Sequence, residues 1–335
     1  MMDTSESPPR AGITDVPGPR SLLRRAWTFS RPLTFVGGGM LLTLAATTAG
    51  ILLDPRVITG APAWLKPAKF AVSISIYCFT LLWLLTFVRG RPSLVRLVAW
   101  ATAVALGMEM VIIAAQVARG TTSHFNVATA LDGALWNAMA FFVVGVWAAN
   151  LLTAALLIVQ RMPDPAFAWS LRLGVIVSFV GMSVAFLMTT ETPAQARAAE
   201  AAGIDAPIQG AHSVGVEDGG PGLPLTGWST TGGDLRVAHF VGLHGLQALP
   251  LLGFLLTGFG PGWLRPGHRM ALVWTTALSY LGLVVLLTWQ ALRGQPLIGP
   301  DATTLGALLA LAAVTGIAAG AVMLHAHTTI HKEKS

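Results

Sequence analysis

Eight apolar stretches run through this chain, each about as long as the roughly 20 residues that a helix needs to cross a bilayer. A soluble domain carries about 25% charged residues, whereas this sequence has 11% charged and 54% hydrophobic residues. It therefore predicts an all-α, polytopic membrane protein with eight transmembrane helices. The expected spans are Leu33 to Leu53, Lys69 to Val88, Leu94 to Val117, Gly133 to Val159, Phe167 to Met188, Leu235 to Thr257, Met270 to Trp289 and Thr303 to Met323.

The distribution of basic residues predicts how the chain is oriented in a bacterial inner membrane. Loops rich in Lys and Arg are retained on the cytoplasmic side. Fourteen of the 21 basic residues fall on the side that holds both termini. We therefore expect both termini to be cytoplasmic, with 1–31 as a mobile polar tail and 327–335 as a second tail.

Charge and cysteine content narrow the classes of function. The formal charge of +6 comes from residues scattered over short loops, which is not typical of a nucleic-acid-binding face. Cys78 is the single cysteine and lies in the second expected span, so the chain has neither a disulfide framework nor a CxxC motif. The remaining partner that composition indicates is the lipid bilayer.

Short segments of the two halves match in the same order. LKPAKF at 65–70 resembles LRVAHF at 235–240, QVARG at 116–120 resembles QALRG at 290–294, FVG occurs at 35–37 and 179–181, and LDGAL at 131–135 pairs loosely with TLGAL at 304–308. Four spans separate the members of each pair, which predicts two parallel-related four-helix bundles, 32–160 and 161–326.

The segment 189–234 interrupts the second half and is the main part expected outside the membrane. Thr192, Pro193 and Gln195 form the pattern of a capping box, which predicts a short helix that ends at Gly203. Long ordered loops often act as lids or binding surfaces. The alternative is a cover over the outer face without a binding role.

Glu109 is the one acid deep within an expected span, and a carboxylate in hydrocarbon is costly enough to need a reason. It lies at a depth similar to that of His244, so the two side chains would hydrogen-bond if their helices face each other. One interpretation is a polar contact that fixes helix packing. The others are a metal, proton or substrate site.

The sixth expected span carries three more polar candidates. His239 and His244 are five residues apart and point about 140° from each other, so they cannot chelate one ion as an i, i+4 pair would. Gln247 lies one turn from His244 and shares its face. Pro250 removes a backbone donor and is typical of a kink.

Together these observations predict an outward-facing polar pocket that binds or transports a small solute or a proton. Its expected residues share a place near the outer ends of the spans: Glu109, His244, His239, Gln247, Gln116, Arg119, Lys69 and Asn137. A metal- or cofactor-dependent membrane enzyme is a second reading, with His124, His239, His244 and Glu109 as possible ligands. A structural or sensory membrane module is a third.

EMVIIAAQVARGTTSHFN and GWSTTGGDLRVAHFVGLHGLQALPLLGF resemble segments of a family of uncharacterised bacterial multi-spanning membrane proteins. That resemblance covers Pro62 to Gly253 and implies a shared outer-face architecture without an established activity. The 4+4 arrangement also resembles haem A synthase, whose haems need histidines on facing helices of each half. Here the one histidine of the first half, His124, lies outside the expected spans, so bis-histidine haem ligation is not indicated.

Overall fold

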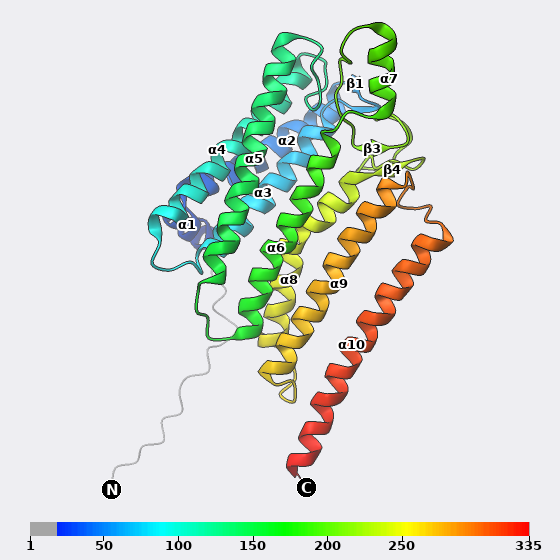
Figure 1. Cartoon of the computed structure of the whole chain (residues 1–335). Coiled ribbons are helices and arrows are strands. Elements are labelled where there is room, and N and C mark those ends of the chain that lie inside the picture. Colours follow the sequence, from blue (N-terminus) through cyan, green and yellow to red (C-terminus); the bar gives the residue numbers. More distant parts are fainter. Residues whose placement is uncertain (1–18, 335) are drawn as a thin grey trace.

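The computed structural model describes residues 19–334, with side chains described to Thr329. Long helices make up most of this part of the chain and run side by side (Figure 1). The helices are α1 Pro19–Phe29, α2 Arg31–Leu53, α3 Leu65–Leu85, α4 Pro92–Ala118, α5 Ala130–Ile158, α6 Pro165–Met188, α7 Pro193–Ala202, α8 Leu235–Gly258, α9 Pro266–Leu292 and α10 Ala302–Lys334.

Eight of the described helices are long and apolar enough to cross a membrane: α2 to α6 and α8 to α10. This confirms the prediction of a helical protein with eight membrane spans. The start of α3 differs from the prediction, because this helix begins at Leu65 rather than near Lys69. Lys66 therefore belongs to the same helix as Lys69, one turn before it.

Four connections gather at one end of the bundle, which we call the loop end: 54–64, 119–129, 189–234 and 293–301. Two of them contain a small antiparallel hairpin, which pairs β1 Val57–Ile58 with β2 Ala61–Pro62, and β3 Ser213–Val214 with β4 Gly233–Asp234. Each hairpin ends just before a span, α3 or α8. The hairpins thus fix where these two helices begin.

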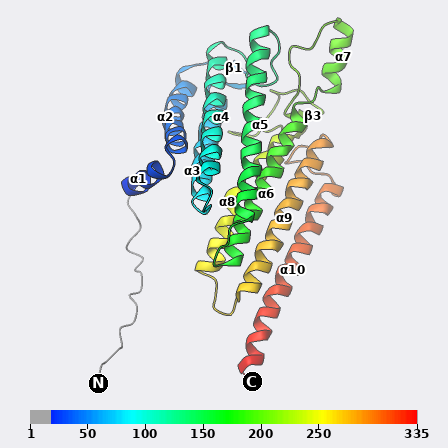
Figure 2. The same ribbon diagram turned by 60° about the vertical axis from the view of Figure 1, so that its left-hand side comes forward.

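Helix contacts follow the same pattern in both halves. In the first, α2, α3 and α4 pack against one another and α5 packs on α4. In the second, α6, α8 and α9 pack against one another and α10 packs on α9. The contact of α5 with α6 joins the halves, and α10 lies at the edge of the bundle (Figure 2).

The most extensive contact, between α6 and α8, depends on glycine. A Cβ on Gly181 would lie 2.6 Å from backbone atoms of Gly242, so neither position has room for a side chain. The FVG segments do not occupy equivalent places, however. Gly37 meets α3 at Cys78, more than one turn further along its partner helix than Gly181 meets α8. This match is therefore out of register with the others.

The segment 189–234 folds over the loop end. Thr192 and Gln195 form the expected capping box of α7, and Gly203 ends the helix in the left-handed region. Gln195 then donates to the carbonyl of Gly210 at 2.9 Å and so ties the helix to the rest of the segment. A backbone bridge between Asn126 and Ile208 joins the segment to the 119–129 connection.

Both expected tails differ from the prediction where the structure describes them. Residues 19–29 form α1, which carries Leu22, Leu23 and Trp27 exposed among its basic residues, as is typical of a helix that lies in a membrane interface. At the other end, α10 continues without a break to Lys334. The rest of the expected tails, 1–18 and 335, lies outside the described residues.

Candidate functional site

Glu109 lies in α4 near the loop end and is 3% exposed. Its Oε1 is 3.6 Å from Nε2 of His124. Its Oε2 is buried and has no hydrogen-bond partner among the residues that the structure describes. One carboxylate oxygen is therefore available to accept a proton or a donor.

His124 comes from the 119–129 connection and turns back over the end of α4. Its Nδ1 is 3.0 Å from Nζ of Lys66 and 3.1 Å from Oγ of Ser123. An ammonium group can only donate, so Nδ1 accepts and the neutral ring carries its hydrogen on Nε2. That hydrogen points to Glu109, at a distance too long for an ordinary hydrogen bond.

Aromatic rings enclose this imidazole. Phe70, Phe125 and Trp136 lie with their ring centroids 5.7, 6.0 and 5.7 Å from that of His124. Burial, together with the charges of Lys66 and His212, holds the pKa of His124 well below its usual value. His124 is therefore neutral near pH 7.

A second pair lies beyond His124, on the segment that covers the loop end. Nδ1 of His212 is 2.6 Å from Oδ2 of Asp218, and the two imidazole centroids of His124 and His212 are 6.2 Å apart. Burial alone would raise the pKa of Asp218, but hydrogen bonds from the His212 ring and from the backbone of Ser213 lower it overall. Burial lowers the pKa of His212, and Asp218 opposes that shift. We call Lys66, Glu109, His124, His212 and Asp218 the loop-end cluster.

Lys69 and Arg236 hold a turn of the covering segment. Nζ of Lys69 donates to the carbonyl of Thr226 at 2.8 Å, and Arg236 donates to the carbonyl of Gly227 at 2.7 Å while it pairs with Asp234. Lys69 lies in the first turns of α3 and Arg236 in the first turn of α8. Each therefore fixes one carbonyl of the same turn.

Gln116 and Arg119 form a corner between α4 and α5 rather than part of the cluster. Both donate to Asp132, which also accepts from Thr129 in the cap of α5. The second half repeats this corner, since Arg293 pairs with Asp301, the residue before α10, and also donates to Thr304. Gln290 there donates to the Pro296 carbonyl.

The candidate residues of the sixth expected span, which is α8, do not lie in one site. His239 contacts the carbonyl of Gly181 at 2.8 Å, which ties α8 to α6. His244 is exposed, and its Nδ1 is 3.3 Å from Oε1 of Gln247, which in turn donates to Thr80 of α3. The expected hydrogen bond between Glu109 and His244 is therefore wrong in the described structure: Glu109 faces His124 instead. Asn137 is exposed on α5.

The expected metal centre of His124, His239, His244 and Glu109 does not form. Among the side chains that the structure describes, no group of three or more His, Cys, Asp or Glu residues is placed to hold a metal ion. His239 is held by a carbonyl and His244 by Gln247, while His124 alone meets Glu109. These residues thus do not fit a shared metal or haem.

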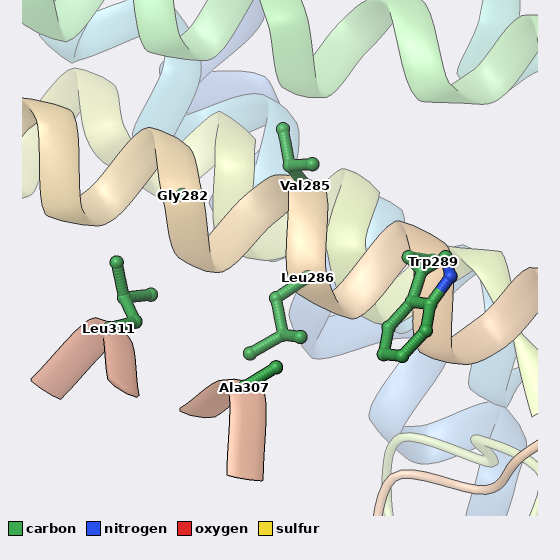
Figure 3. A pocket seen from close by; sticks show the side chains of 6 residues that line it. All are labelled: Gly282, Val285, Leu286, Trp289, Ala307 and Leu311. Carbon is green, nitrogen blue, oxygen red and sulfur yellow. The ribbon is translucent and has the colours of Figure 1, made fainter. Parts of the chain in front are cut away.

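A cavity of about 240 Å³ lies elsewhere, between α9 and α10 (Figure 3). Apolar side chains and one indole form its wall, and no titratable side chain takes part. Such a surface suits hydrocarbon rather than a polar solute. Its lining residues are Gly282, Val285, Leu286, Trp289, Ala307 and Leu311.

No protein-family model matches the chain, and neither a curated protein nor a solved structure is significantly similar to it. The resemblance to uncharacterised bacterial membrane proteins therefore stays a prediction.

The sequence placed Glu109 at the site and offered His124 as a possible metal ligand, but it assigned no role to Lys66, His212 or Asp218. Lys66 lay outside the expected second span, although a longer first turn of α3 would have placed it beside Lys69. His212 and Asp218 come from a loop without periodicity. Their pairing depends on the β3–β4 hairpin, which short polar sequence does not reveal.

Proposed function

We propose that this chain is a membrane protein that binds and releases a proton at Glu109, within the loop-end cluster. The observation that carries the proposal is the buried carboxylate with one unpartnered oxygen, 3.6 Å from the protonated nitrogen of a neutral imidazole. An intramembrane acid of this kind is typical of proton pathways in transporters. The packing role considered from the sequence would instead favour a carboxylate with both oxygens satisfied.

The three innermost groups form a chain along which a proton can move. Lys66 donates to Nδ1 of His124, and Nε2 of the same ring faces Glu109. Transfer of one proton from Lys66 to Nδ1, with release of the Nε2 proton to Glu109, leaves a neutral amine, the other imidazole tautomer and a carboxylic acid. Lys66 then regains a proton from the external solution, so that the net change is uptake of one proton by Glu109. This step needs the Nε2 to Oε1 distance to shorten to that of a hydrogen bond.

The site faces the outer side of a bacterial inner membrane in this proposal. The excess of Lys and Arg on the side of both termini supports a cytoplasmic location for that side of the bundle. The loop end then faces outward and exchanges protons with the external solution. Coupling of that exchange to uptake of a small solute is the transport function that we propose.

Duplication of a four-helix unit is part of the proposal. Two features support it: the helix contacts repeat in the same order, and the Arg119–Asp132 ion pair at the start of α5 has a counterpart in Arg293–Asp301 at the start of α10. Parallel repeats commonly place a site where the halves meet. The cluster fits this rule, since Lys66, Glu109 and His124 come from the first unit and His212 and Asp218 from the second.

Infrared difference spectroscopy of the protein in lipid nanodiscs tests proton binding directly. Titration between about pH 5 and about pH 9 is expected to produce a protonated-carboxyl C=O band that Glu109→Gln removes. His244→Ala is the control, because that side chain is exposed and contacts Gln247 rather than Glu109. A wild-type spectrum without a band that depends on Glu109 contradicts the proposal.

A further inference from the structure

Lys66 and Lys69 lie one turn apart at the start of α3, and neither contacts a carboxylate of the described residues. The polar contact of Lys66 is the neutral ring of His124, and that of Lys69 is the carbonyl of Thr226. Arg236 adds a third cation at the start of α8, but Asp234 already pairs with it. In the described part of the chain, the two ammonium groups therefore have neutral acceptors where counter-ions would bind more strongly.

The turn 223–228 covers these cations and supplies carbonyl oxygens in the place of an anion. The backbones of Leu223 and Trp228 close the turn with a hydrogen bond of 2.8 Å. At its tip Leu225 is exposed and has a positive φ of 64°, which is unfavourable for leucine. Oγ1 of Thr226 is buried without a partner among the described residues. One donor of the turn thus remains free beside Lys69.

The His124 ring connects Lys66 with Glu109, because its Nδ1 contacts the Lys66 ammonium and its Nε2 faces the carboxylate. The titratable groups around Glu109 are Lys66 from α3 and His124 from the 119–129 connection, with His212 and Asp218 beyond them. An anion next to Lys66 would be repelled by a charged Glu109 carboxylate. The same anion would meet no repulsion from the carboxylic acid.

We infer that Lys66 and Lys69, with Thr226 above them, bind an oxyanion whose binding is linked to protonation of Glu109. The ligand class is a solute that carries a carboxylate, sulfate or phosphate group. This inference rests on the proposed proton site and gives it a substrate class. The anion replaces the carbonyl of Thr226 on Lys69, and a proton enters Glu109 as the anion takes over Lys66.

Linkage sets the expected pH dependence. Because the anion prefers the form with protonated Glu109, its affinity rises as pH falls, by up to about tenfold per pH unit, and each bound anion takes up about one proton. Substitution of the acid removes this coupling but keeps the cations. The variant Glu109→Gln therefore binds the anion with an affinity that no longer depends on pH.

The experiment measures binding of sulfate and of acetate to the full chain in nanodiscs of zwitterionic lipid, by calorimetry at about pH 6 and about pH 8 in two buffers of different ionisation enthalpy. Neither probe titrates in this range, so buffer dependence of the heat reports proton uptake by the protein. Lys66→Gln and Lys69→Gln are each expected to weaken binding by about tenfold or more, as for loss of a charge-assisted hydrogen bond. Arg197→Gln is the matched control, since Arg197 is exposed on α7 of the same segment.

A second arm distinguishes the source of the oxyanion. Nanodiscs that contain anionic phosphatidylglycerol are compared with zwitterionic ones. Sulfate or acetate binding that is linked to Glu109, and is unchanged by the anionic lipid, supports a free solute. Loss of sulfate and acetate binding in the anionic discs supports a lipid headgroup that carries the same kind of anionic group and occupies the site. In that case the infrared spectrum of Lys66→Gln in anionic discs is expected to match the spectrum seen in zwitterionic discs.

Two outcomes overturn the inference. One is absence of saturable binding in every disc, and the other is binding that Lys66→Gln and Arg197→Gln reduce equally. The infrared band of Glu109 is measured on the same samples without added anion. If that band is present while anion binding fails, the substrate class is wrong and the proton site stands. If the band is absent, the proton site itself is wrong.

Discussion

Nε2 of His124 lies 3.6 Å from Oε1 of Glu109, although the imidazole belongs to a loop and the carboxylate to the helix that the loop follows. The loop turns back after Gly120, whose φ of 76° lies in the left-handed region that favours glycine. This return brings the ring over the buried acid. Lys66 then reaches the opposite nitrogen of the same ring, so three titratable groups act as one unit.

Non-additive effects on stability are the first expected consequence. Glu109→Gln and His124→Gln remove groups in one network, so their effects on the free energy of unfolding should differ from additivity by roughly 0.5–3 kcal/mol. Chemical denaturation in detergent micelles of the two single variants and the double variant measures this coupling. Glu109→Gln combined with Arg197→Gln on exposed α7 should be additive, and equal coupling in both pairs would contradict a specific contact.

The free energy of unfolding is expected to decrease as pH is lowered, because His124 is buried in its neutral form. Its folded pKa lies below the unfolded value of about 6.5, so the unfolded state binds more protons between the two values. The stabilisation is complete above the unfolded pKa and is lost as pH falls toward the folded pKa. The melting temperature should therefore decrease below about pH 6.5, and less steeply in His124→Gln. Parallel curves for both proteins would rule out this cause.

The sequence predicted the spans well because the bilayer imposes one length and one composition on every helix. Glu109 could be identified for the same reason, since an acid stands out in apolar sequence. Its partner could not be. Depth alone allowed His244, but rotation about α8 turns that side chain outward, and only the path of the 119–129 loop brings His124 to the acid. Loop geometry depends on single φ angles and hydrogen bonds that periodicity does not encode.

The two corner aspartates should differ in their contribution to stability. Asp132 is 4% exposed and accepts from Gln116, Arg119 and Thr129, whereas the side chain of Asp301 is 40% exposed. Asp132→Ala leaves the buried amide of Gln116 without this acceptor, which costs more than loss of an exposed ion pair. We expect a fall in melting temperature of several degrees for Asp132→Ala and a clearly smaller one for Asp301→Ala, measured by differential scanning fluorimetry. Equal decreases in melting temperature would contradict a larger contribution from the buried Asp132.

Close approach of α6 and α8 makes Gly181 intolerant of a side chain. An added Cβ would lie 2.6 Å from backbone atoms of Gly242, which cannot move aside as a flexible side chain would. Gly181→Ala is therefore expected to destabilise the protein by about 1–3 kcal/mol, as for overpacking of a core. Gly316→Ala in α10 is the control, because nothing lies within 4 Å of its added Cβ. Both are compared by denaturation in micelles, and a neutral Gly181→Ala would mean that the helices are further apart.

Separation of His244 from the proton site leads to the last prediction. His244 is exposed and contacts Gln247, whereas His124 faces Glu109. In proteoliposomes with a pH gradient and an entrapped pH-sensitive dye, Glu109→Gln and His124→Gln are expected to lower proton flux by about tenfold or more, a usual effect of losing a proton-transfer group. His244→Ala should retain flux within about twofold, because no transfer step uses its ring. The reverse order, with flux lost in His244→Ala and kept in His124→Gln, would place the proton path along the exposed face of α8 rather than through the loop-end cluster.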